Sequence, residues 1–260
     1  MTGSQTVCQA RRWSKQQPAY WEAADMAVLH LPDHISHQFD KELEDVRSQV
    51  LAMGGVLEDH LLKVLGALSR GNVPMAEEVV ASGYKLDRFE DEIEEACTAI
   101  LLRRQPAAID LRLVLAVSKI IADLERAGNE IERVAAMVVN VSSVANPKSY
   151  YLNVLNIGHS VRRMMNGALD AFARMDSGRA LGTIQQIPDI ERETDAIMRQ
   201  LITYMMEDPR VISRVLDVVL AARSLARVGD HAANICENLI YVVEGRQARP
   251  SDAESPQSEA

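Results

Sequence analysis

Two short rows of oxygen-bearing side chains are the part of the sequence best suited to chemistry. Within each row the residues lie three or four positions apart, which places them on one side of a helix. The rows are Glu125, Asn129 and Glu132, and Asp230, Asn234 and Glu237. Oxygen-only ligand sets suit Mg²⁺, Mn²⁺ and iron. The alternative is a solvated helix face with local ion pairs, such as Glu125 with Arg126 or Arg133.

Other kinds of site find little support. His231 adjoins Asp230, but a lone histidine is more often a surface or hydrogen-bonded residue than a ligand. The sequence contains no GxxxxGK[ST] loop and no GxSxG elbow. None of the six histidines has an acid three residues before it, as di-iron bundles require. We therefore predict no catalytic residue and no enzyme, and a phosphate-compound hydrolase is the weakest alternative.

Helical periodicity fills the chain around these rows. Apolar residues three and four apart form three stripes in the first half, over 39–68, 75–100 and 113–138. Three more follow over 157–172, 181–204 and 215–240. Gly71 and Pro106 should end helices, Pro188 should kink or split one, and another should end near Ser177-Gly178. No hairpin signal interrupts the pattern.

The two halves repeat each other. Arg126-Ala127-Gly128-Asn129 returns 101 residues later as Arg227-Val228-Gly229-Asp230, at the same place in its stripe. A glycine inside a helix indicates either close helix packing or room for a ligand. We predict an all-α fold of two tandem three-helix bundles.

The expected organisation has five segments. The bundles cover 34–141 and 151–245, joined by a linker over 142–150. Residues 1–33 are expected to be a disordered extension, with Met26 as an alternative translation start, and 246–260 a disordered tail.

Composition limits the partners and the compartment. The net charge of −9, with 14 acidic and 6 basic residues between positions 40 and 95, argues against a nucleic-acid binder. Three cysteines without CxxC spacing suit a reducing compartment. No run approaches 18 apolar residues, so no membrane insertion is expected and the protein is predicted to be cytoplasmic.

Five short segments occur in order along the two halves. They are Arg103-Arg104-Gln105-Pro106, Asp110-Leu111-Arg112, Asp123-Leu124-Glu125-Arg126, Tyr204-Met205-Met206-Glu207-Asp208-Pro209-Arg210 and Arg227-Val228-Gly229-Asp230-His231-Ala232. Together they resemble the PhoU family of phosphate-signalling regulators. The resemblance implies a negative regulator of phosphate uptake and of the phosphate-starvation response. It implies an adaptor between the phosphate ABC transporter ATPase and a sensor histidine kinase at the inner face of the membrane, often as a homodimer.

The resemblance also implies metal ligands, because some members bind metal clusters through Glu/Asp-xxx-Asp motifs. Asp87 and Glu191 occupy positions where the family supplies further acids. Here each motif lacks one carboxylate, since Asn129 and Ala226 stand where the motifs have acids. We therefore expect a weakly bound divalent or iron-type ion, or no metal cofactor, and a diverged member of the family. A metal sensor or buffer is the alternative function.

Four arginines near the helix breaks are candidates for partner binding. They are Arg104, Arg112, Arg210 and Arg214. The alternative is that they cap loops or are solvated.

Overall fold

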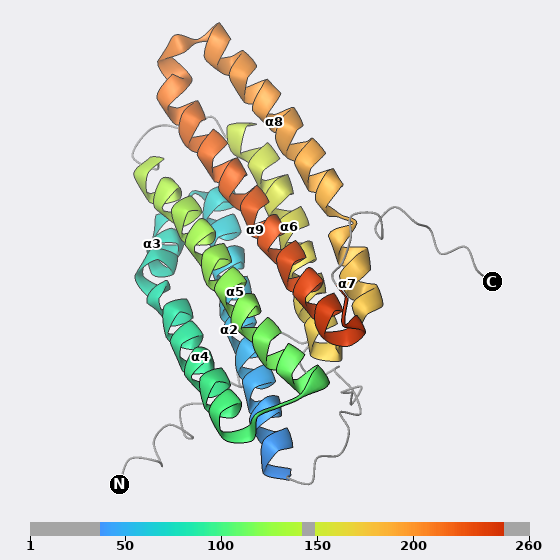
Figure 1. The fold of residues 1–260 in the computed structure, drawn as a ribbon. Coiled ribbons are helices and arrows are strands. Elements are labelled where there is room, and N and C mark those ends of the chain that lie inside the picture. Colours follow the sequence, from blue (N-terminus) through green and yellow to red (C-terminus); the bar gives the residue numbers. More distant parts are fainter. Residues whose placement is uncertain (1–36, 142–148, 247–260) are drawn as a thin grey trace, which may run out of the picture.

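The computed structural model describes residues 37–141 and 149–246, and these form two helical bundles packed side by side (Figure 1). The first bundle contains α2 (His37–Arg70), α3 (Val73–Ser82), α4 (Tyr84–Arg104) and α5 (Ala108–Val141). The second contains α6 (Ser149–Arg174), α7 (Ser177–Ile184), α8 (Ile187–Glu207), the short 3₁₀ turn η2 (Pro209–Val211) and α9 (Ile212–Glu244). The all-α prediction of two tandem bundles is confirmed.

Most helix ends lie where the turn residues predict them. Gly71 has φ +67°, and Asn72 caps α3 by accepting from the Met75 amide at 3.4 Å. Asp208 accepts from the Arg210 amide and starts η2, and Gly245 closes α9 with φ +71°. The α6 helix begins at Ser149, two residues before the expected start of the second bundle. The predicted extension over 1–33 and nearly all of the predicted tail lie outside the described residues.

Two breaks differ from the expected pattern. The 75–100 stripe is two helices, because the chain turns at Gly83 between α3 and α4. The first helix of the second half ends at Arg174, and Ser177-Gly178 begin α7 instead of ending α6. Asp176 explains this second difference, since its carboxylate accepts from the Arg179 amide at 3.0 Å and caps α7. The expected split near Pro188 is confirmed, with α7 ending at Ile184.

The bundles are related by an internal two-fold arrangement. A Cβ on Gly54 of α2 would overlap Leu169 of α6, and a Cβ on Gly158 of α6 would overlap Leu65 of α2. The same sequence interval separates the two glycines and the two leucines, so each half inserts a leucine against the glycine of the other. The helices α5 and α9 also pack against each other along their length.

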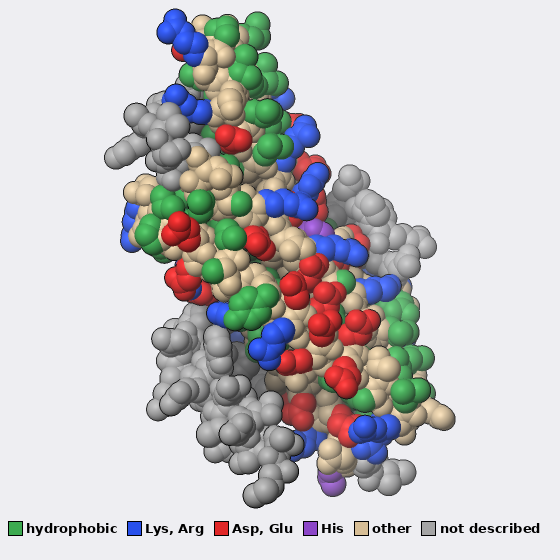
Figure 2. All heavy atoms as spheres, turned by 90° about the vertical axis from the view of Figure 1, so that its left-hand side faces the viewer, with side chains coloured by type: hydrophobic (Ala, Val, Ile, Leu, Met, Phe, Trp, Pro, Cys, Tyr) green, Lys and Arg blue, Asp and Glu red, His purple; other side chains and the backbone are tan. Residues whose placement is uncertain are grey.

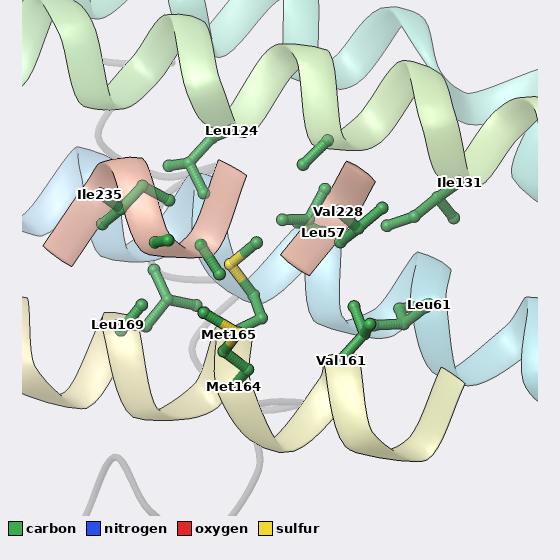
Figure 3. Close-up of a cluster of buried hydrophobic side chains, with 14 of the residues drawn as sticks. Leu57, Leu61, Leu124, Ile131, Val161, Met164, Met165, Leu169, Val228 and Ile235 are labelled. Atoms are coloured by element: carbon green, nitrogen blue, oxygen red, sulfur yellow. The ribbon is translucent and has the colours of Figure 1, made fainter. Parts of the chain in front are cut away.

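One hydrophobic core runs through both bundles. Side chains from α2, α5, α6 and α9 interdigitate in its middle (Figure 3). Leu57, Leu124, Val161 and Val228 contribute one residue from each of these helices, and none exposes any surface to solvent. Burial of this kind contributes about 1.5–3 kcal/mol per large aliphatic side chain. The contact between the two bundles is therefore made by core residues, and it stabilises the fold.

The two repeated glycines have different surroundings. A Cβ on Gly128 would overlap the Cδ1 of Leu86, whereas the nearest atom to a Cβ on Gly229 is Ile190 Cδ1 at 3.5 Å. Gly128→Ala should therefore lower the free energy of unfolding by about 1–2 kcal/mol through overpacking. Gly229→Ala should raise it by up to about 1 kcal/mol, because alanine favours the helix. Urea unfolding of both variants measures the contrast, and equal effects would contradict it.

A buried histidine ties α2 to α3. His60 Nε2 lies 2.9 Å from Ser82 Oγ, and that hydroxyl donates to the Glu78 carbonyl at 2.7 Å. Burial lowers the pKa of His60 to about 4. The folded state therefore binds fewer protons than the unfolded state between pH 6.5 and 4, and stability falls as the pH falls through that window.

We expect this residue to cost about 2 kcal/mol of stability between roughly pH 7 and pH 5. Urea unfolding at pH 7 and at pH 5 measures this loss of stability. In His60→Gln the loss between the two pH values should be smaller by about 2 kcal/mol. His159→Gln, at an exposed position on α6, serves as the control. An unchanged pH dependence in His60→Gln would contradict the assignment.

Candidate functional site

The first row of candidate ligands lies on the outer face of α4 and α5. Asn129 Nδ2 donates to Glu125 Oε1 at 2.5 Å on α5. Glu90 of α4 faces them, and its pKa is raised by burial and then by the negative charge of Glu125. Asp87 is among the further acids that raise it. Figure 2 shows acidic side chains gathered on this side of the molecule.

Glu132, the last member of the first row, lies at the turn between α3 and α4. Its Oε2 would be 2.5 Å from a Cβ on Gly83. The absence of a side chain at position 83 therefore makes room for this carboxylate of α5. Glu132 accordingly belongs to the packing of α5 against the α3–α4 turn.

The second row is divided between two neighbours. Asp230 faces α8, where burial and the charge of Glu191 raise its pKa against the opposing effects of His231 and Arg227. Asn234 and Glu237 face α5 instead. Burial and the charge of Asp123 raise the pKa of Glu237. The structure thus places Asp230 near Glu191, a position where the family resemblance implies a further acid, but separates Asp230 from the rest of its row.

Asn129 and Ala226, which stand where the Glu/Asp-xxx-Asp motifs have acids, differ in their ability to bind a cation. Asn129 is exposed on α5, and its amide is already bonded to Glu125. Ala226 is half-buried on α9, one helical turn before Asp230. Its methyl group has no oxygen, so Ala226 is not a ligand and the second motif supplies only the carboxylate of Asp230. The first half therefore keeps a neutral oxygen, from Asn129, at the position without an acid, whereas the second half has no oxygen there.

A polar cluster between the bundles was not among the predicted sites. Asp123 of α5 is 6% exposed and accepts hydrogen bonds from two residues of α9. His231 Nδ1 lies 2.9 Å and Asn234 Nδ2 lies 3.1 Å from its Oδ1. A sequence signal existed, because Asp123 lies between Ala116 and Ala127 on a second apolar face of the same helix. A helix that is apolar on two faces is packed on both.

The repeat places a matching cluster further along the same two helices. Glu130 of α5, also 6% exposed, receives Arg133 Nη1 at 2.5 Å and Arg227 Nη1 at 3.2 Å. Ser224 of α9 stands at the repeat position of Asp123 and faces Glu130. Burial raises the pKa of Glu130, but Ser224 and the two arginines together bring it below the usual value. Arg133 thus pairs with Glu130, not with Glu125.

The four candidate arginines do not form one surface. Arg104 of α4 binds Glu42 of α2 through Nε at 3.0 Å and Nη2 at 2.8 Å, so it ties two helices together. The Arg112 guanidinium lies against Gly245, where a Cβ would be 2.9 Å from its Nη1. Arg210 is 95% exposed beside Asp208 at the far end of the molecule, and Arg214 is half-buried on α9.

The candidate ligands do not converge in the described residues. Among residues 37–141 and 149–246, no three or more His, Cys, Asp or Glu side chains are grouped so as to hold a metal ion. The predicted metal site therefore stays a prediction. In the same part of the chain, no helix is long and apolar enough to cross a membrane.

Comparison with known proteins identifies the architecture. The PhoU domain model matches the chain twice, over residues 50–138 and 154–239, one match in each bundle. The chain belongs to the PhoU family. A PhoU homologue of Pseudomonas aeruginosa, named a phosphate-specific transport system accessory protein, is 46% identical over 84% of this chain and 90% of its own length. The Escherichia coli PhoU protein of the same name is 38% identical over 86% of this chain and 92% of its own.

Solved PhoU structures share the fold. The crystal structure of PhoU from Pseudomonas aeruginosa superimposes with a TM-score of 0.78 at 45% identity, covering 80% of this chain and all of that one. The phosphate transport system regulatory protein PhoU from Streptococcus pneumoniae gives a TM-score of 0.75 at 25% identity, with 82% of this chain covered. The resemblance first drawn from five short segments is confirmed.

Proposed function

We propose that this PhoU-family chain is an accessory protein of a phosphate-specific transport system that negatively regulates phosphate uptake and the phosphate-starvation response. The observation that carries the proposal is the match to accessory proteins of such systems over nearly their whole length. The family is one of accessory and regulatory proteins, and we propose no enzymatic activity for this member.

In this proposal the protein is an adaptor at the inner face of the membrane. It binds the transporter ATPase and the cytoplasmic part of a sensor histidine kinase, and it acts as a homodimer. The two outer faces carry different sets of acids, which supports binding of two different partners. Glu90 and Glu125 line the α4–α5 face, whereas Glu191 and Asp230 line the α8–α9 face, where Ala226 stands at the repeat position of Glu125. Coupling arises if one partner changes the affinity for the other.

Deletion of the gene tests the regulatory role. A phosphate-starvation reporter should then be expressed in phosphate-rich medium at the level of starved cells, because the kinase is no longer restrained. Re-expression of the full chain is the control and should restore repression. An unchanged reporter would contradict the negative-regulator proposal.

A pull-down tests the adaptor role separately. The full chain from cells grown in high phosphate should retain the transporter ATPase, the kinase or both. Recovery of neither would overturn the adaptor proposal while leaving the regulatory result intact.

Metal sensing is a second proposed function. Carboxylates on each outer face lie close enough to repel one another, and a divalent cation would relieve that repulsion. Asn129→Asp restores a carboxylate beside Glu125 and should tighten Mn²⁺ binding roughly tenfold, since ligand charge sets affinity for such ions. Calorimetric titration measures the change, and Asn140→Asp on the same helix is the control. Equal affinity in both variants would contradict a site at this face.

A further inference from the structure

The hairpin of α8 and α9 carries exposed hydrophobic side chains at its projecting end. Five of them leave 45–80% of their surface in solvent, and we call them the tip patch: Ile202, Met206, Ile212, Leu216 and Leu220. In Figure 1 this hairpin extends past the other helices, and Figure 2 shows hydrophobic side chains gathered at that end with basic side chains beside them. Exposed apolar surface of a few hundred Å² commonly marks an interaction site.

The tip patch runs along both helices of the hairpin as two parallel rows. Met206 and Ile212 lie three residues on either side of Pro209, and Ile202 and Leu216 lie seven residues on either side of it. Because the two helices are antiparallel neighbours, each of these pairs lies at one level of the hairpin. Two rows at matching levels form a groove of the kind into which the side-chain ridge of a third helix packs.

The end turn of the hairpin distinguishes a protein partner from a lipid surface. It carries Glu207 and Asp208, and both are exposed. A membrane met by this end of the molecule would therefore approach two acids first, which anionic lipids repel. The apolar rows lie along the helices behind the turn, so they suit a helix that lies beside the hairpin.

The internal repeat provides a reference for this surface. At the matching end of the first bundle, three exposed leucines correspond to Met206, Ile212 and Leu216: Leu102, Leu111 and Leu115. Polar Thr98 and Lys119 occupy the positions that correspond to Ile202 and Leu220. The end of the second bundle is therefore the more apolar of two ends built on the same scaffold.

Basic side chains also distinguish this end. Four arginines lie in the same stretch of the hairpin: Arg199, Arg210, Arg214 and Arg223. The matching positions of the first bundle hold no basic residue, since they are Glu95, Ile109, Leu113 and Ala122. Arg199 and Arg223 are exposed within one helical turn of Ile202 and Leu220. The tip patch therefore has a positively charged edge on the side nearest the body of the molecule.

We propose that the tip patch docks an amphipathic helix of the transporter ATPase, with its apolar face on the patch and acidic residues along its edge. This rests on the proposed function and deepens it, because it gives the adaptor a docking surface for that partner. The apolar face of the helix packs into the groove between the two rows. Its acids pair with Arg199 and Arg223 at the rim of the interface.

Charge complementarity favours an acidic edge on this helix. The chain has a net charge of −9 and an acidic stretch between positions 40 and 95, which repels an acidic partner. The stretch 198–223 carries four arginines and three acids instead. An acidic helix is therefore steered to this end of the molecule. The names of the relatives, accessory proteins of a phosphate-specific transport system, indicate the transporter as the source of the helix.

Binding of the purified transporter ATPase to the full chain tests the docking surface. Leu216→Asp, at 49% exposure, should weaken binding at least roughly tenfold, because it places an unpaired charge in the apolar contact. Leu115→Asp, at 43% exposure in the matching position of the first bundle, is the control and should bind as the wild type does. Surface plasmon resonance measures the three affinities.

A charge variant tests the acidic edge of the partner helix. Arg223→Glu should weaken binding of the ATPase roughly tenfold and reduce the dependence of the affinity on salt, whereas Arg223→Lys should keep most of both. Stronger binding by Arg223→Glu would overturn the charge assignment.

A milder variant guards against misfolding. Ile202→Thr with Leu220→Lys gives the tip patch the residues found at Thr98 and Lys119, and it should lose ATPase binding with unchanged helicity. Full binding by the tip variants, or loss of binding in Leu115→Asp, would overturn the docking surface while the adaptor proposal stands. A wild type that binds no ATPase would overturn both.

Two further measurements examine other occupants of the tip patch. Flotation with anionic vesicles that Leu216→Asp abolishes would assign the tip patch to lipid, and a change in sedimentation of Leu216→Asp alone would assign it to a second copy of the chain. Either result would overturn the docking of an ATPase helix. Unchanged flotation and sedimentation, together with lost ATPase binding, are the expected outcome.

Discussion

Replacing Leu65 with alanine should lower the free energy of unfolding by about 2–5 kcal/mol. Leu65 is 3% exposed, and its side chain fills the space left by the missing Cβ of Gly158 in the other bundle. The loss combines the transfer of apolar atoms to water with a cavity between α2 and α6. Urea unfolding monitored by circular dichroism measures it.

The repeat allows a sharper form of this test. Gly158→Ala alone should be destabilising, because its Cβ would overlap Leu65. In the double variant the new methyl group occupies space vacated by the leucine, so the combined loss should be smaller than the sum of the single losses. Leu62→Ala, an exposed position on the same helix, is the control and should change stability by less than about 0.5 kcal/mol. Strictly additive losses would contradict the insertion of Leu65 against Gly158.

Replacing His231 with alanine should cost about 2–3 kcal/mol, because it removes one of two donors from the buried carboxylate of Asp123. Asn234 would remain as the other donor, from an exposed position on α9. Amide hydrogen exchange should show faster opening along α5 and α9, whereas protection in α4 should change less.

A double variant separates the lost hydrogen bond from lost packing. Asp123→Ala together with His231→Ala removes both polar partners, so no buried charge is left unpaired. It should therefore be more stable than His231→Ala alone. If His231→Ala has the stability of wild type, the Asp123 cluster does not hold the bundles together.

The sequence predicted what depends on periodicity and local turn chemistry. Six apolar stripes, the turn at Gly71 and the split near Pro188 all correspond to observed features, because hydrophobic spacing and turn residues act over a few positions. The break at Gly83 gave no such signal. Its backbone angles are helical, and its role depends on a carboxylate from α5, which is distant in sequence.

The candidate site was less predictable because its contacts cross between helices. Spacing placed Asp230, Asn234 and Glu237 on one side of α9. The neighbouring helices determine the surroundings of each side chain: Asp230 faces α8, whereas Asn234 and Glu237 face α5. Arg104 was a candidate for partner binding because it lies near a break. The structure shows that it binds Glu42, a contact that requires knowing which helices are adjacent.

The two-fold relation between the bundles makes the connection between α5 and α6 a tether. Each half presents to the other the surface that two subunits would share, with Leu65 and Leu169 as reciprocal anchors. The covalent connection raises the effective concentration of one half near the other. A chain cut between Val141 and Ser149 should therefore reassemble from its two fragments when they are mixed. Either fragment alone would expose its apolar inter-bundle face to water. The two fragments could therefore serve as a split protein, in which folding reports the association of the halves.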